Sequence, residues 1–166
     1  MKNRTVIRMI LLLLTAANLA FIFVMSAEDA ERSSNTSKSV GYSIAGAINE
    51  DFEKMPEPEK KTYVESIDDK VRKSAHILEF AALGALLYAD IYVFGISGLP
   101  GAGLSVAAGA AFAAFDEIHQ LFVEGRGAQL TDILIDTAGA AAGCAVSFLV
   151  IKLIAYITAK KRGHAV

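Results

Sequence analysis

Eight polar residues between positions 76 and 136 are of the types that carry out acid–base chemistry or bind metal ions and anions. A histidine beside a carboxylate can act as a general base or acid, histidine and carboxylates together can ligate a divalent metal ion, and an arginine can bind a phosphate or a carboxylate. The sequence has no His-Glu-x-x-His motif, glycine-rich phosphate loop or nucleophile elbow, so the pattern specifies neither a reaction nor a cofactor. The eight residues are His76, Glu79, Asp116, Glu117, Gln120, Arg126, Asp132 and Asp136.

These residues lie at the ends of apolar blocks that are long enough to cross a membrane. Spans are predicted at about residues 74–94, 104–122 and from 131 to 151 or 156. Successive spans alternate in direction, so the start of the first of these, the end of the next and the start of the last lie at the same membrane face. A charge inside a bilayer costs at least ~2.5–3.5 kcal/mol. The sequence therefore predicts a shared polar pocket at that face.

Helical spacing supports a shared pocket, because residues three or four apart are neighbours on one face of a helix. Gly139 and Gly143 continue the stripe that contains Asp136, and small residues let a second helix approach closely. We expect this stripe to face the interior of the bundle, and Arg126 to pair with at least one aspartate. The neighbouring pairs are His76 with Glu79, Asp116 with Gln120, and Asp132 with Asp136.

A purely structural interpretation stays open beside the functional one. Glu79 could pair with the basic residues just before it, Arg126 could pair with Glu124 in the same turn, and Glu117 could face interfacial water. Each of these arrangements would give an ion network that only stabilises the bundle. An ion or proton carrier would need a polar path across the membrane, and Asp90 alone continues the His76 face in that direction, so such a path is incomplete.

The first apolar block, residues 6–25, predicts one more membrane helix. Its length exceeds the ~7–15 residues of a signal-peptide core, although a basic start with Lys2, Arg4 and Arg8 also fits a signal peptide. The apolar fraction of 54%, gathered in blocks nearly free of charge, is typical of a membrane protein. The net charge of −2 gives no indication of a general nucleic-acid binder. A single cysteine, Cys144, excludes an internal disulfide and a thiolate metal cluster.

Residues 26–73 hold much of the charge and are predicted to lie outside the membrane as helical segments. We expect a polar loop at residues 33–37, and then a helix with an apolar stripe in the membrane interface, ended by Pro56 and Pro58. A second helix is predicted to begin near Pro58 or at Ser66, where Asp69 completes a capping box, and to run directly into the next span. The stripe is formed by Val40, Ile44, Ile48 and Phe52.

The predicted fold is therefore all-α: an integral membrane bundle of about four transmembrane helices with a short extracytoplasmic helical segment. Its parts are an N-terminal transmembrane helix (1–25), the extracytoplasmic segment (26–73), a three-helix membrane core (74–158) and a basic cytoplasmic tail (159–166). The basic clusters at residues 2–8 and 160–162 predict that both termini are cytoplasmic in a multi-pass plasma-membrane protein. The eight basic residues in 26–73 count against this orientation.

The combined motifs closely resemble the VanZ-like family. They are Arg-Lys-Ser-Ala-His-Ile-Leu-Glu-Phe at 72–80, Phe-Asp-Glu-Ile-His-Gln-Leu-Phe at 115–122, Gly125-Arg126, and Asp132 to Asp136 followed by Gly139 and Gly143. The resemblance carries over the same eight candidate residues. It also implies a cell-envelope membrane protein, since the namesake of the family is associated with resistance to the glycopeptide teicoplanin.

Two functions are expected from these observations. The first is a protein that binds, and in one form of the hypothesis modifies, a lipid-linked anionic envelope molecule at the outer leaflet, with membrane lipids as its other partners. The second is a non-enzymatic structural or partner-binding protein whose polar cluster only stabilises the bundle. A water-filled pocket open to the leaflet favours the first, and a dry, fully paired network favours the second.

Overall fold

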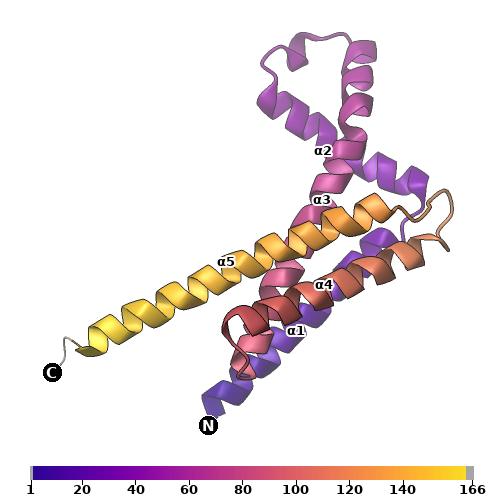
Figure 1. The fold of residues 1–166 in the computed structure, drawn as a ribbon. Helices are drawn as coiled ribbons and strands as arrows, with labels where there is room; N and C mark the ends of the chain where they lie inside the picture. Colours follow the sequence, from indigo (N-terminus) through magenta and orange to yellow (C-terminus); the bar gives the residue numbers. More distant parts are fainter. Residues whose placement is uncertain (1, 164–166) are drawn as a thin grey trace.

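The computed structural model describes residues 2–163, and within that range the chain is helical without any β-strand (Figure 1). The elements are α1 (Lys2–Ser26), α2 (Ala30–Ile48), the short 3₁₀-helix η1 (Phe52–Lys54), α3 (Glu57–Val93), α4 (Gly98–Gln120) and α5 (Leu130–Gly163). The predicted all-α fold is confirmed. Met1 and residues 164–166, the end of the predicted basic tail, lie outside the described residues.

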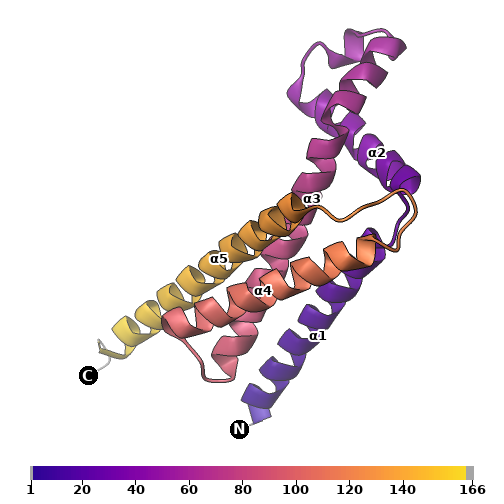
Figure 2. The same cartoon turned by 45° about the vertical axis from the view of Figure 1, so that its right-hand side comes forward.

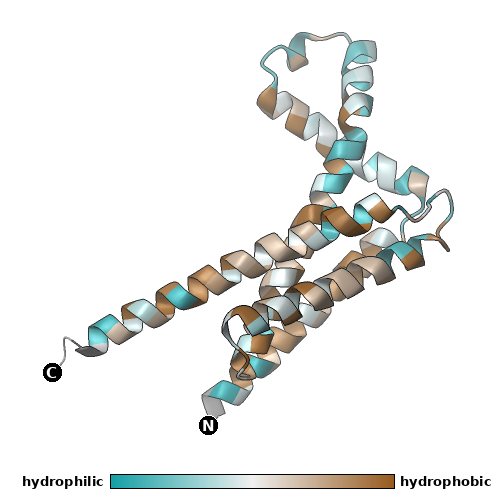
Figure 3. Ribbon diagram, in the orientation of Figure 1, coloured by the Kyte–Doolittle hydropathy of each residue, from teal (hydrophilic) through white to brown (hydrophobic). Residues whose placement is uncertain are grey.

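Four helices are long and apolar enough to cross a membrane, namely α1, α3, α4 and α5. Many of their large apolar side chains are exposed on the outside of the bundle, for example Leu13, Phe115 and Leu149. Apolar residues predominate on these helices within the bundle, whereas the first part of α3, in the segment that projects from it, is mostly hydrophilic (Figure 3). Helices satisfy their own backbone hydrogen bonds, which is why they can be exposed to lipid. The prediction of four spans is confirmed.

Close packing of α3 against α5 organises the bundle. A Cβ atom on Gly139 would lie 2.7 Å from the carbonyl oxygen of Ile77, and a Cβ on Gly143 would collide with the carbonyl oxygen of Ala81. From the other side, a Cβ on Gly84 would collide with the backbone of Ala140. The predicted small-residue stripe therefore does face the interior, where it lets two helix backbones touch.

Helix α1 is fixed to the end of α3 by polar side chains. The hydroxyl of Thr15 donates a hydrogen bond to Asp90 over 2.6 Å in a buried position. The guanidinium of Arg8 donates two hydrogen bonds, of 3.1 and 3.0 Å, to the carbonyl oxygen of Val93, where α3 ends. Arg8 thus satisfies a carbonyl that the helix leaves open at its C-terminus.

Residues 30–73, called the hairpin below, comprise α2, η1 and the first part of α3, and project beyond the membrane bundle (Figure 2). The expected polar loop at residues 33–37 is wrong, because α2 already begins at Ala30. Asp29 caps this helix by accepting a hydrogen bond of 2.7 Å from the backbone N–H of Arg32. The hydroxyls of Ser34 and Ser37 then donate to the carboxylate of Asp68 on α3, which explains the serines within a helix.

The face of α2 that packs on α3 consists of small residues rather than the apolar stripe. Its buried residues are Ser33, Ser37, Gly41 and Ala45. Val40, Ile44 and Ile48 instead remain partly exposed on the neighbouring face. Phe52 lies beyond the end of α2, where η1 turns it into a small core with Ala45 and Val64.

The predicted boundaries of the hairpin helices need correction. Helix α2 ends at Ile48, before the two prolines, and Pro56 and Pro58 instead begin α3. Proline suits the first turn of a helix, where its missing N–H has no intrahelical partner. The capping box at Ser66 is wrong, since Ser66 lies inside α3 and its hydroxyl donates to the carbonyl oxygen of Tyr63 over 2.6 Å. The uninterrupted run of α3 from Pro58 into the span is confirmed.

Candidate functional site

The eight candidate residues are brought to one end of the bundle, called the site end below. Helix α3 supplies His76 and Glu79, and the α4–α5 turn supplies Arg126. A cavity of about 30 Å³ lies there, which is room for one or two water molecules. Seven of its nine lining residues are charged or titratable: Arg72, Lys73, His76, Glu117, Arg126, Asp132 and Asp136, together with Gln120 and Ile135. The lining thus includes every candidate except Glu79 and Asp116.

The innermost group joins three helices. His76 of α3, Asp116 of α4 and Asp136 of α5 each offer a nitrogen or oxygen atom, and these three atoms lie within 4.8 Å of one another. Nδ1 of His76 is 3.8 Å from Oδ2 of Asp136. The glycine stripe explains this approach: contact between Gly139 and Ile77 brings Asp136, one turn before that glycine, beside His76.

Helix α4 holds its two carboxylates with further polar contacts. The side-chain amide of Gln120 donates a hydrogen bond of 3.1 Å to Asp116, one turn earlier on the same helix. Glu117 accepts a hydrogen bond of 2.7 Å from the backbone N–H of Gln129, just before α5 begins. Glu117 is only 2% exposed, so the interpretation that it faces interfacial water is wrong.

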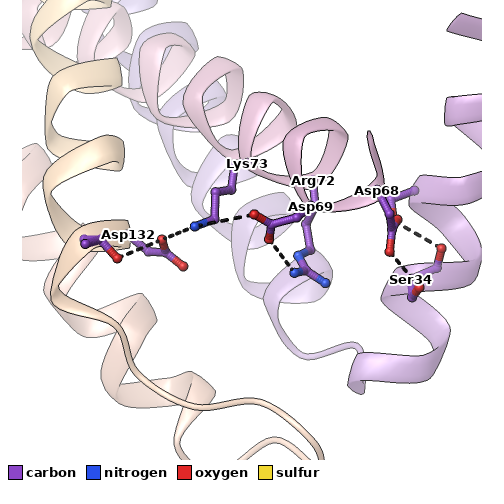
Figure 4. A network of polar contacts seen from close by, with 8 residues as sticks. Ser34, Asp68, Asp69, Arg72, Lys73 and Asp132 are labelled. Atoms are coloured by element: carbon purple, nitrogen blue, oxygen red, sulfur yellow. Dashed lines mark hydrogen bonds and ion pairs between the residues drawn. The ribbon is translucent and has the colours of Figure 1, made fainter. Parts of the chain in front are cut away.

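Two basic residues of α3, Arg72 and Lys73, line the cavity, and both pair with aspartates (Figure 4). Nζ of Lys73 lies 3.2 Å from Asp132 on α5 and 3.7 Å from Asp69 on its own helix. Arg72 contacts Asp69 at 2.9 Å. The alternative in which Glu79 pairs with these bases is therefore wrong. The Oε2 atom of Glu79 is buried and has no hydrogen-bond partner among the described residues.

Arg126 lies in a tight turn that Gly125 makes possible with a φ of 74°. Burial lowers the pKa of the Arg126 guanidinium, and the nearby charge of Arg72 lowers it further, while Asp116, Glu28 and Glu117 act in the opposite direction. Within residues 2–163 the guanidinium makes neither a hydrogen bond nor an ion pair, so the predicted direct pairing with an aspartate, or with Glu124, is wrong. Its donors are available to a ligand.

A groove of about 550 Å³ opens beside the polar cavity, between α1, α2 and α3. Much of its wall is apolar, and the exposed stripe of α2 forms one side of it. The groove shares Arg72, His76 and Arg126 with the cavity. Its apolar lining includes Phe21, Met25, Val40, Ile44, Ile48, Ile67, Val71 and Leu78.

Sequence reasoning did not find the groove or the contact between Lys73 and Asp132. The groove arises from the angle between α2 and α3, and the spacing of residues within one helix does not predict the angle between two helices. For the ion pair a signal existed: Lys73 and Asp132 both stand at the predicted starts of spans on the same membrane face.

Four membrane-spanning helices around a buried polar cluster define a multi-pass membrane protein. The model of the VanZ/LLP1 family matches residues 9–152, most of the sequence, and the chain belongs to this family. The resemblance based on the motifs is therefore confirmed, and the match extends further, through α1 and the hairpin. No curated protein and no solved structure gives a significant match to the chain.

Proposed function

We propose that this VanZ/LLP1 family member binds an anionic lipid-linked molecule of the cell envelope. The anionic headgroup is held where the polar cavity meets the groove, at Arg72 and Arg126, and the hydrocarbon chain lies in the groove between α1, α2 and α3. The candidate residues act in this proposal as the polar part of one binding site. The proposal concerns binding and includes no reaction step.

One observation carries the proposal: the polar cavity and the apolar groove meet at Arg72, His76 and Arg126. An amphiphile has a polar end and an apolar end joined in the same way. The volume of the groove is within the range of small-molecule sites, about 300–1,000 Å³. The stripe of Val40, Ile44 and Ile48 also remains without protein cover, although burial against α3 would have removed it from water.

The charges at the meeting point fit an anion. Arg126 has five guanidinium donors and no ion pair within the described residues. Arg72 and Lys70 also line the groove, against two acids, Glu28 and Glu79. Arginine binds phosphate and carboxylate groups in a bidentate geometry, which makes it suited to a phosphate headgroup.

Native mass spectrometry of the full chain can test the proposal after reconstitution with equal amounts of phosphatidylglycerol and phosphatidylcholine. We expect the wild type to retain the anionic lipid in preference. Arg126→Gln should lower that preference by removing a positive charge. Lys61→Gln is the matched control, because Lys61 is exposed and lines neither the cavity nor the groove. Ile44→Trp should lower total retention by filling the groove, whereas Ile157→Trp, at a similarly exposed site on α5, should not.

The structural alternative makes the opposite prediction. If the cluster only stabilises the bundle, the wild type shows no preference for the anionic lipid, and Arg126→Gln changes thermal stability alone. Equal retention by Ile44→Trp and Ile157→Trp would likewise contradict a chain-binding groove.

The proposal places the protein in the plasma membrane, with both termini in the cytoplasm and the site end at the outer leaflet. Membership of the VanZ/LLP1 family supports a link to glycopeptides as an extension. In a susceptible Gram-positive host, expression of the chain should then raise the teicoplanin concentration that inhibits growth, and Arg126→Gln should remove the increase. An unchanged inhibitory concentration would reject the extension and leave lipid binding to its own test.

A further inference from the structure

We infer that His76, Asp116 and Asp136 form a binding site for one divalent transition-metal ion. Each residue comes from a different helix, and each offers a donor atom within 4.8 Å of the other two. The inference does not depend on lipid binding. It rests on the partners that these three side chains have and lack.

The surroundings of Asp136 are the strongest support for a metal ion. Its side chain is 3% exposed, and within residues 2–163 it accepts no hydrogen bond. Its contact with His76 is 3.8 Å long, beyond hydrogen-bond distance. A carboxylate that is nearly all buried retains its charge only beside a cation or with hydrogen-bond donors. Asp136 is therefore a carboxylate that a cation at this position would stabilise.

His76 on α3 can contribute a ligand atom for the same ion. Its Nδ1 atom is buried and has no hydrogen-bond partner among the described residues. A second carboxylate, Asp116, lies within the same 4.8 Å group, so two like charges face each other there. A neutral imidazole nitrogen and two carboxylate oxygens are a ligand set for a divalent metal ion.

The nearby lysine and arginine side chains do not pair with Asp116 or Asp136. Lys73 is engaged by Asp132 and Asp69 at the rim of the cavity, and Arg72 by Asp69. Arg126 makes no ion pair with either carboxylate. An ion within the triad would thus balance carboxylate charges that no lysine or arginine among the described residues contacts.

The distances suit a metal ion after small side-chain rotations. Two ligand atoms at ~2.1 Å from one ion are about 3–4.2 Å apart, depending on the angle between them. The contact of 3.8 Å lies inside this interval, and the limit of 4.8 Å for the whole group is slightly above it. The adjoining cavity of about 30 Å³ has room for one or two waters at the remaining positions. Gln120 orients Asp116 through its hydrogen bond, as outer partners of metal ligands do.

Mn²⁺ is a suitable probe because its free ion gives an electron paramagnetic resonance signal that is lost on binding. The full chain is delipidated in detergent, treated with a chelator and titrated in phosphate-free buffer. We expect one Mn²⁺ per chain for the wild type. Asp136→Asn and His76→Ala should each weaken binding about tenfold or more. Glu65→Gln is the matched control and should stay within about threefold, because this exposed carboxylate on α3 lines neither the cavity nor the groove.

Thermal unfolding of each variant without metal shows whether it folds, and Asp116→Asn replaces any variant that does not. A wild-type titration that leaves the free Mn²⁺ signal unchanged would overturn the inference. Equal binding by wild type and a folded triad variant would do so as well. Both results leave the lipid experiment valid, since that experiment measures retained phospholipid and adds no metal ion.

Discussion

Lys73 on α3 and Asp132 on α5 join the two most closely packed helices at the rim of the cavity, with 3.2 Å between Nζ and Oδ1 (Figure 4). Their side chains are 31% and 25% exposed, so water screens the pair only in part. The contact crosses the site end just outside the buried group of His76, Asp116 and Asp136. It holds the cavity wall together without entering the innermost group.

A double-mutant cycle measures this contact. Lys73→Ala and Asp132→Ala should each lower the free energy of unfolding in detergent, and the double variant should lose less than the sum of the two. The expected coupling is about 0.5–1 kcal/mol, because the pair is partly exposed. Additive losses would show that the two side chains do not interact in solution.

Contact between the backbones of α3 and α5 predicts a strong effect of one methyl group. Gly143→Ala places a Cβ against the carbonyl oxygen of Ala81 and should destabilise the protein by roughly 1–3 kcal/mol or more. Gly103→Ala on α4 is the matched control, since nothing lies within 4 Å of its added Cβ. That variant should be neutral or gain about 0.5–1 kcal/mol from helix propensity. Equal thermal stability of the two variants would contradict the packing of α3 on α5.

Attachment of α1 to α3 depends on Thr15. Thr15→Val keeps the shape of the side chain and removes the hydroxyl that donates to Asp90, so a loss of about 0.5–2 kcal/mol in unfolding free energy is expected. Thr158→Val is the control, because the hydroxyl of Thr158 bonds only to a carbonyl of its own exposed helix turn. An unchanged melting temperature of Thr15→Val would mean that Asp90 finds its partner elsewhere.

The proposed orientation can be checked with single cysteines at opposite ends of the bundle. Lys61→Cys in the hairpin should react with an impermeant thiol reagent in intact cells, and Ser97→Cys in the turn before α4 should react only after lysis. Both positions are exposed, and the natural Cys144 is 2% exposed, so background labelling is low. The reverse labelling pattern would move the site end to the cytoplasm.

The membrane helices and the convergence of the candidate residues could be predicted from sequence because both follow from periodicity. Apolar length defines a span, and alternating directions bring the ends of α3, α4 and α5 to one level. The glycine stripe was predictable for the same reason: Gly139 and Gly143 lie on one helix face, and close packing needs small residues there.

Features that depend on contacts between helices could not be predicted in this way. The apolar stripe of α2 was expected in the membrane interface, but the face of α2 that packs on α3 was not predicted. The serine and glycine face does so, because Asp68 supplies a partner for Ser34 and Ser37. The residue types at positions 33–37 are typical of a loop when they are considered without their partners on α3. Arg126 was expected to pair with an aspartate, but the turn at Gly125 holds it apart, and a turn conformation is not visible in spacing.

The unbroken course of α3 from the hairpin into the bundle has a consequence for how the chain can change in length. Each residue inserted between Asp69 and His76 would rotate the hairpin by about 100° around the helix axis. The groove wall formed by Ile44 would then no longer stand beside His76. An insertion of about seven residues would restore the rotation, but at ~1.5 Å per residue it would still move the hairpin about 10 Å along the helix axis, so this stretch has little tolerance for insertions. An insertion in the non-helical tip of the hairpin, at residues 49–51, would not rotate α3, so natural variation in the length of the hairpin should be found there.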